Sequence, residues 1–421
     1  MSKERVYRFF WGEKADTYAW RLWLLFFAVI AFLAFFQPAK RNITHHYNQA
    51  ARDWWKGEDM YSLKGAGFLY FPQSVLVYTP FAWQDFPEDR EEFNRQPLSE
   101  TLLPTLPLRI AETLYRAFAL GLFAWAIWRM CERFKPDART LSLFALVTVL
   151  TIPASTTAGR NGQFNMLLSA SMILAAVEIS DRRWWLATAW LILGVMIKPL
   201  GMVPLLLFGA LYRPLWWRLP VGFAAFFALS FVHYDPAYVV RQWEMCIEQV
   251  RTASLPPSNH FDDIAAMFRT FGLNFPDAAW FPVRALFAPL TLLLAWRLTR
   301  IYPPRMAAFL VAAAAAVYLM LFNPRNETNS FLILSPYIAL FAAVICREKG
   351  RGRLFWLLAF LCIGFGSDTY GDIYKVTKIW FKPLLACVFF GVLTSWAIRR
   401  QEILFAAKSA PASDYAERKI K

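Results

Sequence analysis

The sequence has few charged residues. Only 18% of its 421 residues are Asp, Glu, Lys or Arg, and 57% are hydrophobic, whereas about a quarter of a soluble globular protein is charged. The hydrophobic residues come in blocks of about 16 to 22, close to the roughly 20 that a helix needs to cross a bilayer. The composition therefore excludes an ordinary soluble protein and predicts a polytopic membrane protein.

The chain also lacks the signatures of nucleotide-driven and hydrolytic chemistry. It has no P-loop, no Gly-x-Gly-x-x-Gly after a strand, no His-Glu-x-x-His and no nucleophile elbow. Its five cysteines are scattered without a close pair, so they predict neither a disulfide framework nor a metal site. We expect no metal and no cofactor.

The positive charge lies between the hydrophobic blocks. Lys and Arg outnumber Asp and Glu by 45 to 30, which gives a net charge of +15. The basic residues form short clusters at the N-terminus, in every second connection and at the C-terminus, as the positive-inside rule predicts for cytoplasmic segments. We therefore expect membrane lipids and no nucleic acid as partners. The expected location is the plasma (inner) membrane, with both termini in the cytoplasm.

The hydrophobic blocks predict about twelve transmembrane helices, with a range of ten to thirteen. They lie near residues 20–36, 108–130, 140–157, 164–180, 184–197, 200–213, 216–233, 281–299, 305–322, 329–346, 353–367 and 380–397. Several contain Pro or Gly, which membrane helices tolerate. We expect an all-α fold with a single integral-membrane domain over residues 1–400 and a polar cytoplasmic tail at 401–421.

The outer connections hold most of the unusual polar sequence. They are the long loops 37–107 and 234–280 and the short turns TTAGRNGQ (156–163), IKPLG around Lys198, NPRNETN (323–329) and SDTYGDIYK (367–375). The polar groups of a channel would run through the full thickness of the membrane. Polar sequence on one side instead favours a membrane enzyme that acts on the outer face.

The first outer loop begins with an amphipathic pattern. Its hydrophobic residues recur at helical spacing, as in a helix that lies at a membrane interface: Tyr47, Ala50, Ala51, Trp54 and Trp55. Gly57 is placed to end this helix. The loop 234–280 predicts one or two further interfacial helices, which could form the acceptor side or act as a lid or spacer.

The segment FLYFPQSVLVYTP at 68–80 is hydrophobic but short for a crossing, and it contains two prolines. Because proline is favoured in the first turn of a helix, the segment predicts a short re-entrant or interfacial helix from Pro72 to Pro80. We expect Tyr70 and Gln73 to face the cavity where substrates meet.

These motifs resemble those of glycosyltransferase family 87. The matching pieces are YNQAAR (47–52), GEDMY (57–61), LYFPQSVLVYTPF (69–81), GQFN (162–165) and the KP turn at 198–199, and the likeness covers roughly residues 40–340. The resemblance implies an integral-membrane hexosyltransferase with a fold like that of the GT-C superfamily. It also implies a polyprenyl-phosphate-linked sugar donor, by analogy carrying mannose, and a glycolipid or glycan acceptor on the extracytoplasmic face.

One residue departs from the family pattern. The family usually places an aspartate ahead of the tyrosine helix, and it resembles the catalytic base of the superfamily; here that position is Ile43. A group near the membrane surface must still take the proton of the acceptor hydroxyl. The candidates are Asp59, the pair His45 and His46, and the distant Glu327, and the sequence leaves the choice among them open.

Cations at three outer turns predict a phosphate site. Arg160, Lys198 and Arg325 each lie at the outer end of a predicted span, where they could bind a lipid phosphate or simply reach the lipid head groups. Amides in the same turns could bind sugar hydroxyls or could serve only as turn formers: Asn161, Gln163, Asn165, Asn326 and Asn329.

The alternative to an enzyme is a secondary transporter or a flippase of lipid-linked sugars. A transporter predicts charged residues at mid-membrane and a repeat between the two halves. No repeat is apparent, and the charged residues within the spans lie mostly near their ends. The exceptions are Glu112 and Arg116, which are one helical turn apart and can pair with each other.

Overall fold

The computed structural model describes residues 9–12, 14–62, 67–134, 141–253 and 261–401. Every regular element in these ranges is a helix, which confirms the all-α prediction. The predicted tail lies outside the described residues except for Gln401.

The helices follow the hydrophobic blocks, with short helices added in the outer loops. The first half contains α2 (Ala15–Phe36), α3 (Thr44–Lys56), η1 (Pro72–Ser74), α4 (Val75–Tyr78), η2 (Thr79–Phe81), α5 (Arg90–Arg95), α6 (Leu98–Thr101), α7 (Leu106–Glu132), α8 (Leu143–Asn161), α9 (Asn165–Ser180), α10 (Trp184–Ile197), η3 (Pro199–Gly201) and α11 (Met202–Leu211). The second half contains η4 (Arg213–Leu215), α12 (Arg218–Ser230), α13 (Pro236–Ala253), α14 (Ile264–Thr270), α15 (Asp277–Ile301), α16 (Pro304–Phe322), η5 (Thr328–Ile333), α17 (Ser335–Lys349), α18 (Arg353–Gly364), η6 (Ser367–Thr369), α19 (Gly371–Thr377) and α20 (Phe381–Ile398).

All twelve hydrophobic blocks form helices, but fewer of them are full-length spans. By length and composition, seven described helices can cross a membrane, or eight if the bent pair α11–α12 counts as one span. The chain bends by 116° between the two members of that pair. The helices α9, α10 and α18 have only 16, 14 and 12 residues. At about 1.5 Å per residue, each is shorter than the hydrocarbon core, which is about 30 Å thick.

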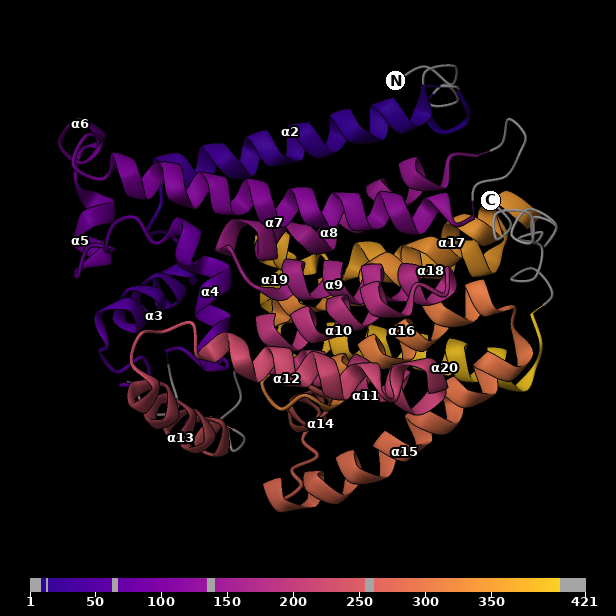
Figure 1. The fold of residues 1–421 in the computed structure, drawn as a ribbon. Coiled ribbons are helices and arrows are strands. Elements are labelled where there is room, and N and C mark those ends of the chain that lie inside the picture. Colours follow the sequence, from indigo (N-terminus) through magenta and orange to yellow (C-terminus); the bar gives the residue numbers. More distant parts are fainter. Residues whose placement is uncertain (1–8, 13, 63–66, 135–140, 254–260, 402–421) are drawn as a thin grey trace, which may run out of the picture.

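The short helices gather at one end of the long ones. In Figure 1, α2 and α7 run side by side, with α5 and α6 at their left ends and α3, α4 and α13 below that part of the view. The start of α2 and the end of α20 both lie at the opposite end. The connections predicted to be basic also meet at that end. There Arg347 donates to the carbonyl of Phe134 over 2.5 Å, and Arg305 donates to that of Arg133 over 3.3 Å. These basic connections and the helices of the first long loop therefore lie at opposite ends of the bundle.

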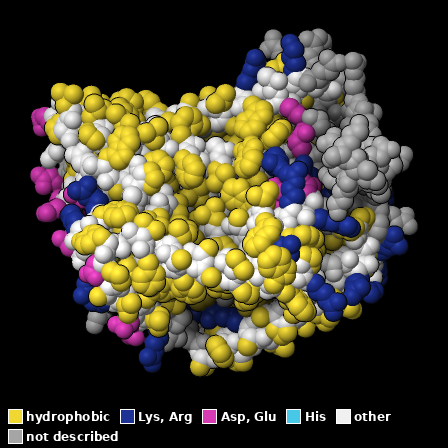
Figure 2. Space-filling view, in the orientation of Figure 1, with side chains coloured by type: hydrophobic (Ala, Val, Ile, Leu, Met, Phe, Trp, Pro, Cys, Tyr) yellow, Lys and Arg dark blue, Asp and Glu magenta, His cyan; other side chains and the backbone are white. Residues whose placement is uncertain are grey.

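The interior of the bundle is formed by α9, α16 and α17. The buried share of the hydrophobic stretch is 89% in Pro304–Phe322 (α16) and 100% in Thr328–Lys349 (η5 and α17). It is only 28% in Ala15–Phe36 and 22% in Ala278–Ile301, which lie at the periphery. Five consecutive alanines at 312–316 let neighbouring helices approach α16 closely. Figure 2 shows hydrophobic side chains over the middle of one face, with most Lys, Arg, Asp and Glu toward its two sides.

The first outer loop folds largely as predicted. The helix α3 buries Tyr47, Ala51 and Trp54 and ends at Gly57, whose φ of 76° is left-handed. It starts at Thr44, ahead of Tyr47, the first residue of the predicted amphipathic pattern. The FLYFPQSVLVYTP segment starts its helix at the predicted proline, although it divides into η1, α4 and η2. The loop 234–280 supplies α13 and α14, in line with the one or two helices expected there.

Candidate active site

Three segments that are far apart in the sequence, all predicted to face outward, meet at one point. The helix α8 ends where Gly162 takes a left-handed φ of 66°, a conformation that glycine adopts easily, and α9 starts at Asn165. The helix α10 stops just before Lys198. The third segment is the connection 323–327 between α16 and η5.

Asn165 lies at the centre of this meeting point and is fully buried. Its Nδ2 donates to Gln163 Oε1 over 2.8 Å and to Asn329 Oδ1 over 3.0 Å, and its Oδ1 accepts from Lys198 Nζ over 2.8 Å. Gln163 in turn donates to Glu327. We call these five residues the Asn165 cluster. The fold thus joins four of the predicted substrate-binding residues to one of the predicted bases.

Glu327 is the carboxylate of this cluster. Its side chain is partly exposed, so a substrate can reach it. Burial lowers the pKa of the Lys198 ammonium, and the nearby Glu327 carboxylate partly opposes that change. Burial also lowers the pKa of Arg325, again against the effect of Glu327. Glu327 therefore lies in the electrostatic field of two cations that could hold a phosphate.

Aromatic rings form a wall beside the cluster. Tyr47 of α3 stacks on Phe164 with the ring centroids 4.0 Å apart, and its hydroxyl lies 3.2 Å from that of Tyr70. Burial raises the pKa of Tyr47, and Glu327 adds to the shift, so the ring lies within electrostatic range of the carboxylate. Tyr70 thus contacts this wall, and its role in facing the substrates stays a prediction. The sequence reasoning did not single out Tyr47 as a site residue, although the helical spacing had put it on the apolar face of α3.

Ile43 occupies the position where the family has its aspartate, next to a different carboxylate. Its backbone N–H donates to the carbonyl of Asn161 over 3.1 Å. On either side of Ile43, Asn42 and Thr44 donate to the buried Glu112, with shortest distances of 2.7 Å. The chain around Ile43 is therefore held by Glu112 of α7.

The Glu112 carboxylate is enclosed by donors. Arg116 pairs with it at 2.5 Å, as the helical spacing predicted, and Tyr78 also donates to it. Both members of the ion pair are almost completely buried. We call Glu112, Arg116, Asn42, Thr44 and Tyr78 the Glu112 lock. Since donors occupy both carboxylate oxygens, the lock fixes α3 to α7 and leaves little room for a substrate proton.

The two candidate histidines have an environment that weakens them as bases. Burial lowers the pKa of His45 to about 3, and the neighbouring His46 and Arg90 add to the shift. Arg90 lies 2.9 Å from Nδ1 of His45. Burial, followed by Arg90, also lowers the pKa of His46. Among the described residues, no recorded hydrogen bond joins either histidine to the Asn165 cluster.

Asp59 lies on the side of α3 that faces α13. Its carboxylate accepts from the backbone N–H of Tyr61 over 2.8 Å. The next residue, Met60, donates from its backbone to Gln242 of α13 over 3.3 Å. Asp59 is thus part of the turn that follows α3 and contacts α13. It has no recorded bond to the Asn165 cluster within the described ranges.

The remaining predicted residues have contacts of their own. Arg160 lies close to Arg41 and has no ion pair with a described residue. The Arg325 guanidinium lies 5.8 Å from the ring of Phe261. Gln73 is fully buried and accepts from Ser230 of α12 over 3.1 Å.

Asn326 acts as a tether, since its amide donates to the carbonyls of Asp262 and Met320 over 2.8 and 2.9 Å. Lys382 of α20 provides a second tether for the same connection. Its ammonium donates to Asp368 over 2.6 Å and to the carbonyl of Thr328, next to Glu327, over 2.8 Å.

A comparison with protein-family models matches residues 68–324, more than half of the chain, to glycosyltransferase family 87. The chain belongs to glycosyltransferase family 87. This membrane protein is therefore a glycosyltransferase, with a sugar donor and an acceptor as substrates. A search of curated proteins gave no match.

The matched region of this family 87 glycosyltransferase contains part of the candidate site. It covers Gln163, Asn165 and Lys198, whereas α3 precedes it and Glu327 follows it. The fold brings the matched and unmatched parts together at the Asn165 cluster. The likeness inferred over residues 40–340 is confirmed for the matched region.

Proposed function

We propose that this glycosyltransferase moves a hexose, by analogy mannose, from a polyprenyl-phosphate-linked sugar to a glycolipid or glycan acceptor. The proposed location is the extracytoplasmic face of the plasma membrane, with both termini in the cytoplasm. Two features support this orientation. Basic connections meet at one end of the bundle, as the positive-inside rule predicts for cytoplasmic loops, and the Asn165 cluster is formed by the other set of connections.

The Asn165 cluster is the observation that carries the proposal. It combines a carboxylate, a desolvated ammonium and amides near the ends of membrane helices. A lipid-linked sugar presents a phosphate at the membrane surface and hydroxyls around the sugar ring. Lys198, Arg325 and Arg160 would bind the phosphate, because cations pair strongly with it when water is scarce. The amides Asn161, Gln163 and Asn329 would bind the hydroxyls, and the fully buried Asn165 would hold Gln163, Asn329 and Lys198 in position. Tyr70 and Gln73 would lie in the surrounding wall.

We assign the catalytic base to Glu327. The acceptor oxygen attacks the anomeric carbon, the bond from that carbon to the phosphate oxygen breaks, and the lipid phosphate leaves with the bonding electrons. The acceptor proton passes to the Glu327 carboxylate. Lys198 and Arg325 would stabilise the negative charge that develops on the phosphate. The environments of His45, His46 and Asp59 give these residues no comparable position.

A reconstituted transfer assay tests the proposal. The full chain in lipid nanodiscs would receive radiolabelled polyprenyl-phosphate mannose or polyprenyl-phosphate glucose, together with membrane glycolipid acceptors. We expect label in the acceptor and release of polyprenyl phosphate. The same donors would be offered to sealed proteoliposomes. Translocation of the intact lipid-linked sugar, with no transfer from either donor, would support the flippase alternative and overturn the proposal.

A further inference from the structure

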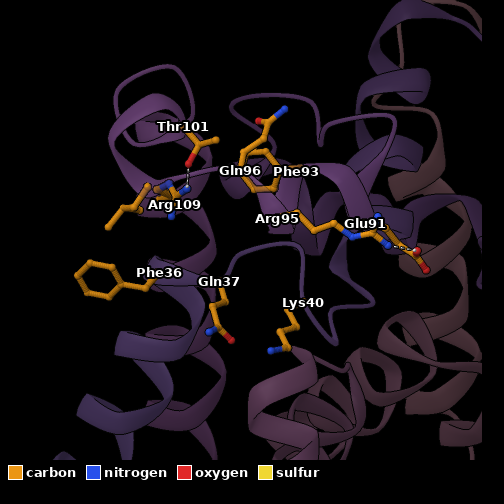
Figure 3. A pocket seen from close by; sticks show the side chains of 10 residues that line it. Phe36, Gln37, Lys40, Glu91, Phe93, Arg95, Gln96, Thr101 and Arg109 are labelled. Atoms are coloured by element: carbon orange, nitrogen blue, oxygen red, sulfur yellow. Dashed lines mark hydrogen bonds and ion pairs between the residues drawn. The ribbon is translucent and has the colours of Figure 1, made fainter.

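A polar pocket lies at the outer end of α2, away from the residues of the Asn165 cluster. Its volume is about 310 Å³, at the small end of the range of ligand sites. Figure 3 shows Gln37 and Lys40 on one side of it and Phe93, Arg95 and Gln96 on the other. A pocket of this size suits a lipid headgroup better than a whole lipid.

The inner wall of the pocket carries a buried charge that lacks an acidic partner. Arg109 is 1% exposed, and its guanidinium donates to Thr105 Oγ1 at 2.8 Å, Thr101 Oγ1 at 3.1 Å and the carbonyl of Phe35 at 2.5 Å. The ring of Phe93 covers it at 5.7 Å. All these partners are neutral, and Arg109 forms no ion pair with a described residue. A buried cation is stabilised by an anion, so the pocket favours an anionic ligand.

The rim adds further positive charge. Lys40 is exposed, and its ammonium has no recorded partner among the described residues. Arg95 pairs with Glu91 over 3.6 Å, but both side chains are more than three-quarters exposed, so this ion pair is weak. The lining thus holds three cations against one carboxylate. The amides of Gln37 and Gln96 can donate to phosphate or hydroxyl oxygens.

A hydrophobic stripe leads along α2 to the mouth of the pocket. It is formed by exposed side chains on one face of the helix: Leu25, Val29, Phe32 and Phe36. Phe36 and the exposed Leu98 also line the pocket itself. Acyl chains can therefore lie along α2 while their headgroup occupies the pocket. A soluble phosphate has no hydrophobic part that could contact this stripe.

We propose that the pocket binds the phosphate headgroup of an anionic membrane lipid at a site separate from the Asn165 cluster. The bound headgroup would order the segment between α2 and α3. That segment joins the pocket to the Glu112 lock, because Asn42 donates both to the carbonyl of Pro38 at 2.5 Å and to Glu112 at 2.7 Å. Arg109 also lies one turn before Glu112 on α7.

Binding of short-chain lipids to the purified full chain tests this site. Native mass spectrometry in detergent would compare phosphatidylglycerol, phosphatidylcholine and inorganic phosphate as ligands. We expect a single tight site for phosphatidylglycerol. Lys40→Gln and Arg95→Gln should each weaken it about fivefold, since a basic residue near anionic lipid contributes about 1 kcal/mol. Arg109 stays unchanged in this test because its hydrogen bonds hold α7 to α2.

Lys375→Gln serves as the matched control. Lys375 is an exposed outer lysine that pairs with Asp372 at 2.8 Å and does not line the pocket. Its variant should bind phosphatidylglycerol as the parent does. Equal affinity for phosphatidylglycerol and phosphatidylcholine would overturn the proposal, as would equal losses in Lys375→Gln and Lys40→Gln. Inorganic phosphate bound as tightly as the lipid would reject a lipid in favour of a soluble anion.

Discussion

Two glutamates among the outer elements show how similar groups serve different ends. Glu112 is 0% exposed, pairs with Arg116 at 2.5 Å and accepts from three further side chains. Glu327 is partly exposed and has one recorded side-chain donor, Gln163. Two cations lie near Glu327, yet Lys198 gives its hydrogen bond to Asn165. One carboxylate has its acceptor sites filled, and the other retains capacity for a ligand.

This difference indicates that Glu112 contributes to stability, whereas Glu327 is free to take part in the reaction. A carboxylate whose oxygens are all bonded holds elements together, because removing it would leave buried donors without partners. A carboxylate with free acceptor capacity and cations nearby can take a proton while the cations bind phosphate. The same difference bears on Ile43, which stands where the family usually has an aspartate. That stretch of chain belongs to the Glu112 lock, and we place the chemistry at the Asn165 cluster.

The strongest test of the comparison is Glu327→Gln. We expect sugar transfer to fall by about 100-fold to 10,000-fold, the usual loss when a general base is removed. The amide keeps the shape and the contact with Gln163, so the thermal unfolding temperature should change little. Transfer would be followed with radiolabelled donor, and unfolding by intrinsic fluorescence. Transfer near the parent rate would show that Glu327 is not the catalytic base and would leave Asp59 and the histidines as candidates.

Glu112→Gln should show the opposite pattern. Removing one partner of a buried ion pair leaves Arg116 uncompensated and costs about 3–5 kcal/mol of stability. We expect a large fall in the unfolding temperature, while the protein that remains folded retains most of its turnover per molecule. Adding Arg116→Met should recover part of the lost stability, because the uncompensated charge is then removed. A loss of turnover without a loss of stability would contradict the assignment of Glu112 as a lock.

Lys198→Met should have a smaller effect on transfer than Glu327→Gln. Loss of a charge-assisted contact to the donor phosphate is worth about 1.5–3 kcal/mol, or roughly 10- to 100-fold in rate. Lys198→Arg should restore part of the rate, since it keeps the positive charge. The assay would vary the donor concentration to separate KM from kcat. Equal rates for Lys198→Met and the parent would show that this ammonium only stabilises Asn165.

The sequence was informative where one segment carries its own signal. Hydrophobic blocks predicted every helix long and apolar enough to span a membrane. Pro72 and Gly57 marked helix ends, and the spacing of Glu112 and Arg116 predicted their pair. Contacts across long separations were harder to predict. No local pattern shows that Tyr78 would reach Glu112 or that Arg90 would lie against His45. The same limit explains the span count, since a helix break at Lys198 and short helices such as α10 look like full spans in hydropathy alone.

The smallest expected effect concerns His45, beside the Glu112 lock. Its pKa is 6.5 in an ordinary setting and about 3 in the fold, because burial, His46 and Arg90 all disfavour the charged ring. Between these values the unfolded chain binds more protons, so stability is lost as the pH falls below about 6.5. Asp53 works in the opposite direction, since burial raises its pKa to about 6, but it is present in both proteins. His45→Gln should therefore lose about 1–2 °C less than the parent in unfolding temperature between pH 7.5 and 5.5. Its pH profile of turnover should stay unchanged. A shifted turnover profile with an unchanged unfolding profile would instead make His45 part of the chemistry. The region of the Glu112 lock and the Asn165 cluster would then no longer differ in role.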